Sequence, residues 1–337
     1  MIDISDKNLL EEYLIQRGIV QSGDGHSVHY CKGGVSGTVV YLDLPGKTPM
    51  IIKQALAQLK VKDTWLCDPN RMGVEYDSNR IFHDLMPDNA PEVYFYDDVN
   101  YIYGREAVPD GCAMWKSDLM SGLLDFEVAR KSIETLVEVH NHCAGNQEMA
   151  ERFASKAVFY DLRIDPYITF TVKKYPALQE AADRVSREMM ENNISLVHGD
   201  YSPKNIMVVG RGISVLDYEV AHYGHPAFDL AFFTNHFMLK SIQFPELSGA
   251  FRTMLRYMTN IYMDKMAYMD KDVLEECTVR TLAFLMLARV DGKSPVEYMV
   301  GHAEKQQRVR DIAFALLDRK AETFDQVLAI AAEFDCV

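Results

Sequence analysis

A short polar run interrupts the helical second half of this 337-residue chain. It reads His198-Gly199-Asp200-Tyr201-Ser202-Pro203-Lys204-Asn205, and β-type runs at 195–198, 206–209 and 213–216 surround it. Asp217 follows the last of these runs. Ile and Val favour strands, whereas Asp, Ser, Pro and Asn favour turns. The pattern therefore restricts the fold to one in which a helical body carries a carboxylate-bearing loop between short strands.

The spacing of these polar residues suits phosphoryl transfer from a nucleotide. Such a reaction needs one carboxylate near the attacking hydroxyl and oxygen ligands that hold Mg²⁺ on the ATP phosphates. We expect Asp200 to orient the hydroxyl or accept its proton, and Asn205 and Asp217 to bind Mg²⁺. His198 is expected to brace the loop. The alternative is that Asp200 and Asn205 only form turns, but Asp217 at hairpin distance favours the catalytic interpretation.

The first third of the chain has a different pattern. It predicts a helix at 6–17, strands at 38–42 and 50–53, a helix at 71–85, and a hairpin that joins 93–96 to 101–103. After residue 106 the chain is mostly helical. We therefore predict an α+β fold of two lobes: a small antiparallel sheet with a helix at 1–106, and a larger helical lobe at 107–337. ATP would lie in the cleft between the lobes.

The small lobe supplies the residues that a nucleotide requires. Gly33, Gly34, Ser36 and Gly37 form a turn before the strand at 38–42, and Lys53 lies in the next strand. Glycines let a backbone approach phosphates closely, although most glycine turns only make hairpins, and a lone strand lysine is common at sheet edges. Glu75, in the following helix, is expected to pair with Lys53. Asp77 is the competing carboxylate, and a solvated Glu75 is the alternative.

The sequence resembles the aminoglycoside phosphotransferase and choline kinase superfamily of small-molecule kinases, which have a protein-kinase-like fold. The resemblance rests on His198-Gly199-Asp200 with Asn205, on Asp217-Tyr218-Glu219, and on residues 223–231, which end in P-x-x-D-L-A. It implies a bilobal fold, ATP and Mg²⁺ as cofactors, and a small-molecule hydroxyl as acceptor. It also implies that Asp229 anchors the catalytic loop rather than taking part in the chemistry.

Within this superfamily the first third most resembles 5-methylthioribose kinase. Gly33-Gly34-Val35-Ser36, and Ile52-Lys53-Gln54-Ala55-Leu56 followed by Trp65 and Glu75, carry that likeness. Two features depart from it: Asn205 is present, and the chain has no Arg-Arg pair. The likeness therefore concerns the ATP lobe and not the acceptor.

Further candidates concern the nucleotide base and the acceptor. The backbone of Glu106 is expected to meet the adenine ring, and Trp115 to line the acceptor site, although a single Trp more often packs in a core. Glu219 is a candidate for the metal or the substrate, with a buried structural role as the alternative. Arg280 and Arg289 are the basic residues to consider in the C-terminal helices: one of them is a candidate for binding a sugar or phosphate oxygen, and a surface salt bridge is the alternative.

Composition limits the partners and the location. The net charge is −14, which argues against nucleic-acid binding. The 6 cysteines show no zinc spacing, and their scatter suggests a reducing compartment. The first residues lack the pattern of a signal peptide, and no apolar run is long enough to span a membrane. We therefore expect a cytoplasmic protein.

Three functions remain open at this stage. The first is a metabolic kinase of a sugar or amino alcohol, with a methylthioribose-like acceptor as its most specific form. The second is an aminoglycoside kinase that confers antibiotic resistance, which the acidic charge suits but Glu219 disfavours. The third is a nucleotide-binding pseudokinase without activity. The joint presence of Lys53, Asp200, Asn205 and Asp217 argues against this third function.

Overall fold

A computed structural model describes residues 2–31, 37–56 and 67–335 of the chain. The chain forms two compact units. The smaller unit contains Met1–Gly111 together with Ser214–Glu219, and the larger unit contains Cys112–Ile213 and Val220–Val337. The segment that bears Asp217 thus belongs to the smaller unit, although it lies far along the sequence from the rest of that unit.

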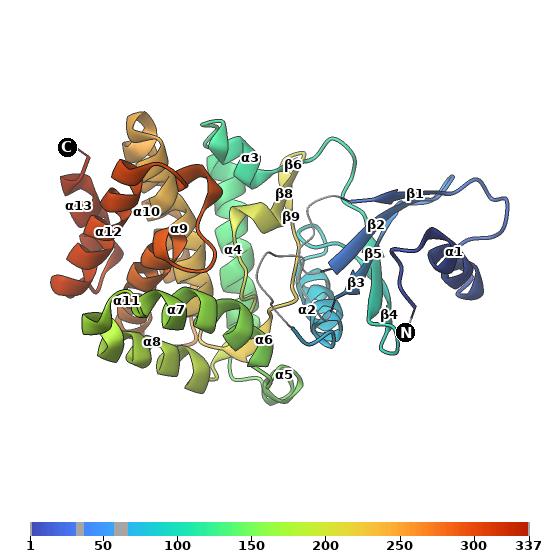
Figure 1. The fold of residues 1–337 in the computed structure, drawn as a ribbon, viewed down its shortest axis with the longest axis horizontal. Coiled ribbons are helices and arrows are strands. Elements are labelled where there is room, and N and C mark those ends of the chain that lie inside the picture. Colours follow the sequence, from blue (N-terminus) through green and yellow to red (C-terminus); the bar gives the residue numbers. More distant parts are fainter. Residues whose placement is uncertain (1, 32–36, 57–66, 336–337) are drawn as a thin grey trace. The chain divides into compact units, whose positions relative to one another are not determined.

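The smaller unit is an antiparallel sheet with a helix on each face. Its strands have the order β1-β2-β3-β5-β4 (Figure 1). The elements are α1 (Lys7–Gln16), β1 (Ser27–Tyr30), β2 (Gly37–Asp43), β3 (Met50–Ala55), α2 (Arg71–Leu85), β4 (Val93–Asp97) and β5 (Ile102–Glu106).

Alternation along β3 sends neighbouring side chains to opposite faces of this sheet. Ile52 packs with Leu10 and Leu14 of α1 in one apolar cluster. Ala55 packs with Met72 of α2 in a second cluster. Lys53 is one residue from Ile52 and two residues from Ala55, so it shares the face of Ala55. In the sheet register it pairs with a β5 residue. The strand therefore places a lysine on the α2 side of the sheet.

A buried carboxylate ties α1 to the end of β4. Asp97 accepts hydrogen bonds from the Tyr13 hydroxyl (3.0 Å) and from the backbone N–H of Asn100 (3.1 Å), and it forms an ion pair with Arg17 (2.8 Å). Its side chain is 7% exposed. Burial alone would raise the pKa of Asp97, but these partners outweigh burial and lower the pKa to about 2.

We predict that Asp97→Asn destabilises the protein at neutral pH. Since the folded-state pKa lies below the ordinary value, the ionised group contributes its stability above about pH 4 and loses it as the pH falls to about 2. The expected loss is about 1 to 2 kcal/mol of unfolding free energy. Urea unfolding at pH 7 and at pH 3 measures it. A difference from the parent protein that does not shrink at the lower pH would contradict the prediction.

The larger unit is mainly helical, as the sequence predicts. It contains β6 (Ala113–Met114), α3 (Trp115–Met120), α4 (Phe126–Cys143), α5 (Gln147–Arg152), α6 (Ala157–Phe159), a π-helix (Tyr160–Thr169), α7 (Phe170–Val172), α8 (Gln179–Glu191), β7 (Ser195–Val197), β8 (Ile206–Val209), β9 (Gly212–Val215, whose last residues enter the smaller unit), β10 (His222–Gly224), α9 (Ala227–Gln243), α10 (Ser248–Lys265), α11 (Lys271–Asp291), α12 (Ala303–Asp318) and α13 (Phe324–Glu333). Single 3₁₀ turns lie at Pro176–Leu178, Pro203–Asn205, Pro245–Leu247 and Glu297–Met299.

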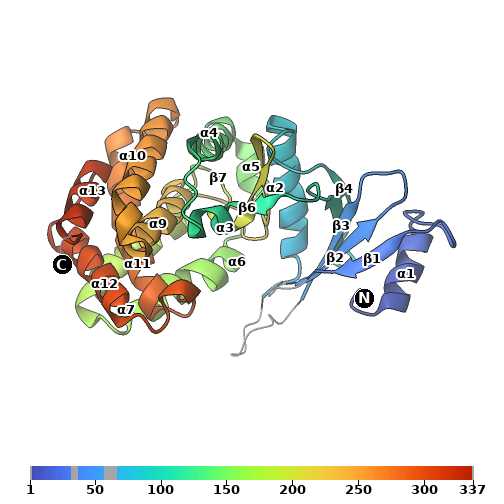
Figure 2. The same cartoon turned by 90° about the horizontal axis from the view of Figure 1, so that it is seen from above.

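Helix α9 is the centre of this unit. All but the last of its residues are buried, and it packs against α10, α11 and α12 (Figure 2). Two small sheets, β10-β7 and β6-β8-β9, lie among the helices. They hold the polar loop that the sequence singles out, because β7 precedes it and β8 follows it.

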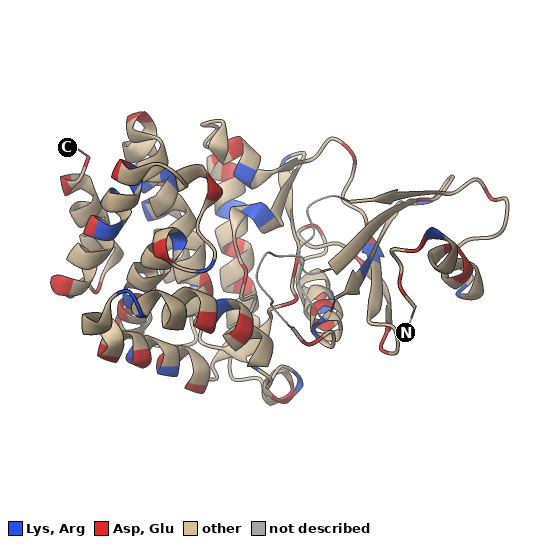
Figure 3. Cartoon of the chain, viewed as in Figure 1, with Lys and Arg blue, Asp and Glu red and all other residues tan. Residues whose placement is uncertain are grey.

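Charges are mixed over the outer helices, where acidic and basic segments alternate in the larger unit (Figure 3). Among the described residues, no helix combines the length and the apolar character that crossing a bilayer requires.

Candidate active site

The loop between β7 and β8 is fixed by a carboxylate at the start of α9. Asp229 accepts the backbone N–H of His198 (2.6 Å) and that of Gly199 (2.8 Å). It is fully buried and also contacts His140 Nε2 of α4 at 3.3 Å. Burial alone would raise the pKa of Asp229, but His140 and the His198 N–H outweigh it and lower that pKa. Asp229 thus has the geometry of the loop anchor that the resemblance implies.

Gly199 is required by the turn itself. Its φ is +76°, in the left-handed region, and a Cβ there would lie 2.6 Å from the Val220 carbonyl oxygen. The buried His198 side chain closes the turn, because its Nδ1 accepts the backbone N–H of Asp200 at 3.2 Å. His198 therefore has the bracing contacts expected from the sequence.

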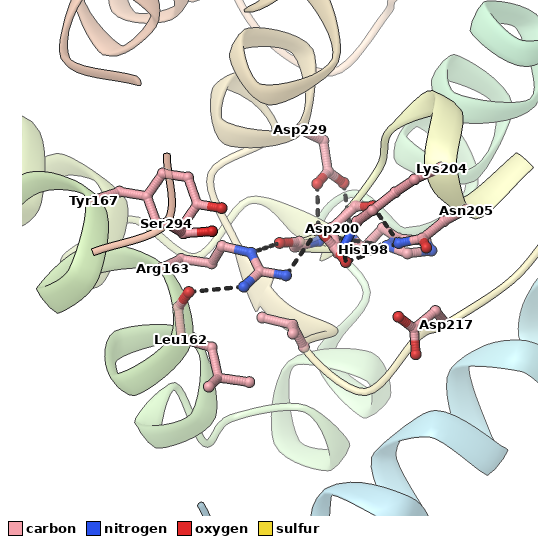
Figure 4. A network of polar contacts seen from close by, with 12 residues as sticks. Leu162, Arg163, Tyr167, His198, Asp200, Lys204, Asn205, Asp217, Asp229 and Ser294 are labelled. Atoms are coloured by element: carbon pink, nitrogen blue, oxygen red, sulfur yellow. Dashed lines mark hydrogen bonds and ion pairs between the residues drawn. The ribbon is translucent and has the colours of Figure 1, made fainter. Parts of the chain in front are cut away.

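Asp200 is surrounded by donors in the larger unit (Figure 4). Arg163 Nη2 lies 2.8 Å from Asp200 Oδ1, while Lys204 Nζ and Asn205 Nδ2 each lie 2.8 Å from Oδ2. The residue is only 3% exposed. Two cations and an amide thus hold both carboxylate oxygens in place.

Arg163 is a site residue that the sequence analysis missed. It lies in the π-helix Tyr160–Thr169, and its Nε also donates to the Gly199 carbonyl at 2.7 Å. π-helices are rare, and those that occur are frequently found at functional sites. An arginine between Leu162 and Ile164 is the signal in the sequence, because a charged residue within an apolar run must find a partner if it is buried.

The smaller unit gathers a second polar cluster around Lys53. Its Nζ lies 2.7 Å from Glu75 Oε2 and 2.7 Å from Asp217 Oδ1, and 4.0 Å from Glu219 Oε2. Glu75, rather than Asp77, is thus the helix carboxylate that meets the strand lysine. Tyr103 also donates to Glu75, at 3.0 Å.

The charges of this cluster depend on one another. Burial alone would lower the pKa of Lys53, but Asp217, Glu75 and Glu219 outweigh it and raise that pKa well above its usual value. Burial also raises the pKa of Glu75, and Asp217 and Glu219 add to this effect while Lys53 opposes it. Lys53 is thus a cation fixed among carboxylates. When one of these carboxylates binds a metal, Lys53 is suited to hold phosphate oxygens.

The acidic residues of the smaller unit fit a hard cation. One oxygen from each of Glu75, Asp217 and Glu219 lies within 4.8 Å of the others. Asp217 has a φ of 68°, a left-handed conformation that is uncommon for residues other than glycine and that clusters at functional sites. In the larger unit, Asn205 uses its amide nitrogen on Asp200, so its amide oxygen is the atom suited to Mg²⁺.

The other predicted nucleotide residues are in the smaller unit. Gly33, Gly34 and Ser36 lie outside the described residues. Gly37 begins β2, where a Cβ would lie 2.6 Å from the Gln54 carbonyl oxygen. The N–H of Glu106 donates to the Glu92 carbonyl (2.8 Å) and its carbonyl accepts from Arg105 Nη1 (2.7 Å), so both backbone groups expected to meet the adenine ring have partners within the protein.

Three candidates for the acceptor or the metal have structural contacts. Trp115 has no exposed surface and packs against Phe233 and Phe237, so its ring has no face for an acceptor. The Arg280 guanidinium pairs with Glu188 (2.9 Å) and Glu276 (2.6 Å), as in the salt-bridge alternative. Glu219 is buried and accepts from Arg71 Nε at 3.1 Å.

We predict that Gly199→Ala lowers both stability and turnover. A non-glycine residue in the left-handed region costs about 1 to 3 kcal/mol, and the Val220 carbonyl must also move. Gly249→Ala in α10 is the matched control, because Gly249 has open space around it and no positive φ. Urea unfolding and turnover are the measurements, and equal values for Gly199→Ala and the parent protein would refute the requirement.

Comparison with known proteins agrees with this geometry. Residues 89–254 match the sequence model of the phosphotransferase enzyme family. Methylthioribose kinase 2 of Oryza sativa subsp. japonica is 26% identical over 229 residues, which covers 59% of this chain and 53% of that protein. The chain thus spans about half the length of this curated relative. The resemblance predicted from the motifs is confirmed.

Solved structures confirm the fold class. The ethanolamine kinase of Plasmodium vivax superposes with a TM-score of 0.51 at 13% identity, covering 98% of this chain and 89% of that one. The streptomycin–ATP–APH(2″)-IIa ternary complex gives a TM-score of 0.50 at 13% identity, covering 91% and 97%. At 13% identity the superpositions show the fold alone, a protein-kinase-like α+β fold, and they do not identify an acceptor.

Proposed function

We propose that this protein is an ATP- and Mg²⁺-dependent phosphotransferase that moves the γ-phosphoryl group to a hydroxyl of a small molecule. One observation carries the proposal: Asp200 is held rigidly by Arg163, Lys204 and Asn205 in a loop that Asp229 anchors. A carboxylate positioned in this way can orient a hydroxyl and accept its proton, which is the task that phosphoryl transfer requires.

The remaining roles are assigned by chemistry. Lys53, oriented by Glu75, would hold phosphate oxygens, and Asp217 and Asn205 would bind Mg²⁺ as oxygen ligands. The metal would neutralise charge on the phosphates, and the protein would contribute position and fixed dipoles. The likeness to methylthioribose kinase favours a sugar-like acceptor. The intact set of Lys53, Asp200, Asn205 and Asp217 disfavours a pseudokinase.

We expect Asp200→Asn to reduce phosphoryl transfer by about two to four orders of magnitude, the usual contribution of a positioned proton acceptor. Nucleotide affinity should stay near that of the parent protein, because Asp200 would face the acceptor. Asp217→Asn is the contrasting variant, and it should lose the Mg²⁺-dependent part of nucleotide affinity.

The assay incubates the protein with ATP, Mg²⁺ and a mixed pool of sugars, amino alcohols and aminoglycosides, and mass spectrometry detects any species that gains a phosphate. Calorimetry measures nucleotide binding with and without Mg²⁺. If Asp200→Asn retains turnover, Asp200 is not the group that acts on the hydroxyl. If Mg²⁺ still raises the nucleotide affinity of Asp217→Asn as much as that of the parent protein, Asp217 is not a metal ligand. A phosphorylated aminoglycoside would support the resistance function instead.

A further inference from the structure

Two basic side chains of the larger unit, the half-buried Arg289 and the fully buried Lys240, have no carboxylate partner among the residues that the structure describes. Arg289 of α11 donates from Nη1 to the Tyr167 hydroxyl (3.0 Å) and to the Ser294 carbonyl (2.7 Å). Lys240 of α9 has no exposed surface, and its Nζ donates to the His236 carbonyl at a long 3.3 Å. A buried charge is costly unless an opposite charge compensates it. These two side chains therefore favour the binding of an anion.

Packed side chains connect both cations with Asp200. The Arg163 guanidinium, which holds Asp200, lies 5.9 Å from the ring centre of Tyr167, and the Arg289 guanidinium lies 5.7 Å from the same ring. Figure 4 shows Tyr167 and Ser294 beside Arg163. The ring of Phe232 lies 5.5 Å from the Arg163 guanidinium and 5.7 Å from the Tyr167 ring. Arg289 and Arg163 thus both lie near the Tyr167 ring.

The chain of contacts continues from Phe232 to Lys240. The ring of His236 lies 5.4 Å from that of Phe232, and Lys240 Nζ lies 5.9 Å from the ring centre of Tyr298. His236 Nε2, Arg289 Nε and the Tyr298 hydroxyl are buried and have no hydrogen-bond partner within the described part of the chain. His236 is 8% exposed. Because buried polar atoms are normally satisfied, this group of atoms points to a bound ligand.

Positive neighbours shift the pKa values of both Lys240 and Tyr167. Burial, Lys116 and Arg289 lower the pKa of Lys240 to about 7, while Glu297 opposes them. Burial would raise the pKa of Tyr167, but Arg289 and Arg163 outweigh it and lower that pKa.

The neighbouring carboxylates are already engaged with other cations. Glu297 binds Lys116, and Asp200 binds Arg163 and Lys204. The surplus of positive charge in this region therefore falls on Arg289, and on Lys240 when it is protonated, although the whole chain carries a net charge of −14.

We infer that the acceptor carries a carboxylate or phosphate group besides its reacting hydroxyl, that Arg289 binds this anionic group, and that Lys240 adds positive charge from the core behind it. The inference rests on the proposed function and narrows its acceptor to a sugar acid, another hydroxy acid or a sugar phosphate. A guanidinium fork binds either kind of anion through paired N–H groups. The same cations repel ammonium groups, so the site disfavours polycationic aminoglycosides and amino alcohols.

The test uses acceptors in matched sets: glucose, gluconate and glucose phosphate, and likewise glycerol, glycerate and glycerol phosphate. Each is incubated with the full-length protein, ATP and Mg²⁺, and kcat/KM is measured from product mass. We expect an acid or a phosphate to exceed its neutral parent by at least about tenfold, the gain of one charge-assisted contact. The two arms separate carboxylate from phosphate. A neutral or cationic acceptor that reacts equally well would overturn the inference.

Variants locate the anionic group. Arg289→Gln and Lys240→Met should each raise KM for the anionic acceptor about ten- to hundredfold and leave KM for ATP unchanged. Arg256→Gln is the matched control, since Arg256 is an exposed cation of α10 paired with Asp325. Lys240→Met should also raise the melting temperature without acceptor, because it removes a buried charge. A lower melting temperature with an unchanged KM would indicate a structural role and contradict the inference.

A binding measurement keeps the inference testable if phosphoryl transfer fails. The melting temperatures of the parent protein, Arg289→Gln and Arg256→Gln are measured at increasing concentrations of gluconate or glucose phosphate. A stabilisation that disappears only in Arg289→Gln would support the anion site even if no acceptor is phosphorylated, and the proposed function alone would then be wrong. Equal shifts in all three proteins, or no shift in any, would overturn the anion site.

Discussion

The site in the larger unit depends on the hydrogen bonds that Asp229 accepts from two backbone N–H groups. The carboxylate lies in the first turn of α9, the most deeply buried helix, and it holds His198 and Gly199 in a turn with a positive φ. This turn sets the direction of Asp200. A carboxylate that is buried and charged is costly unless its oxygens are fully engaged, and here His140 and the loop backbone engage them.

The two clusters use opposite electrostatic arrangements. In the smaller unit, one lysine is surrounded by the carboxylates of Glu75, Asp217 and Glu219, which suits a metal that is carried in with a nucleotide. In the larger unit, one carboxylate, Asp200, is surrounded by cations. An anionic acceptor would find compensating charge in the larger unit, whereas an anionic nucleotide would find it in the smaller unit only together with its metal.

Local patterns predicted much of this arrangement. The loop 198–205 could be identified because its residues are close together in the sequence. Glu75 could be identified because the helix that follows the strand of Lys53 places a carboxylate within reach of that lysine. Arg163 could not be identified in this way, because it reaches Asp200 across 37 positions from a π-helix that no apolar periodicity reveals. Arg289 was recognised as a candidate, whereas Lys240 depends on how α9 packs in the core. Trp115 illustrates the opposite error, because this large aromatic residue near a predicted site packs against Phe233 and Phe237 of α9 instead.

Amide hydrogen exchange in Asp229→Asn tests the central claim most directly. Replacing one carboxylate oxygen with an amide removes an acceptor from the His198–Gly199 turn and leaves the volume nearly unchanged. The account predicts that the amides of residues 198–205 exchange much faster, while those of α9 and α10 stay protected and phosphoryl transfer falls. Unchanged protection of the loop in the folded variant would show that Asp229 does not hold it, and would contradict the account.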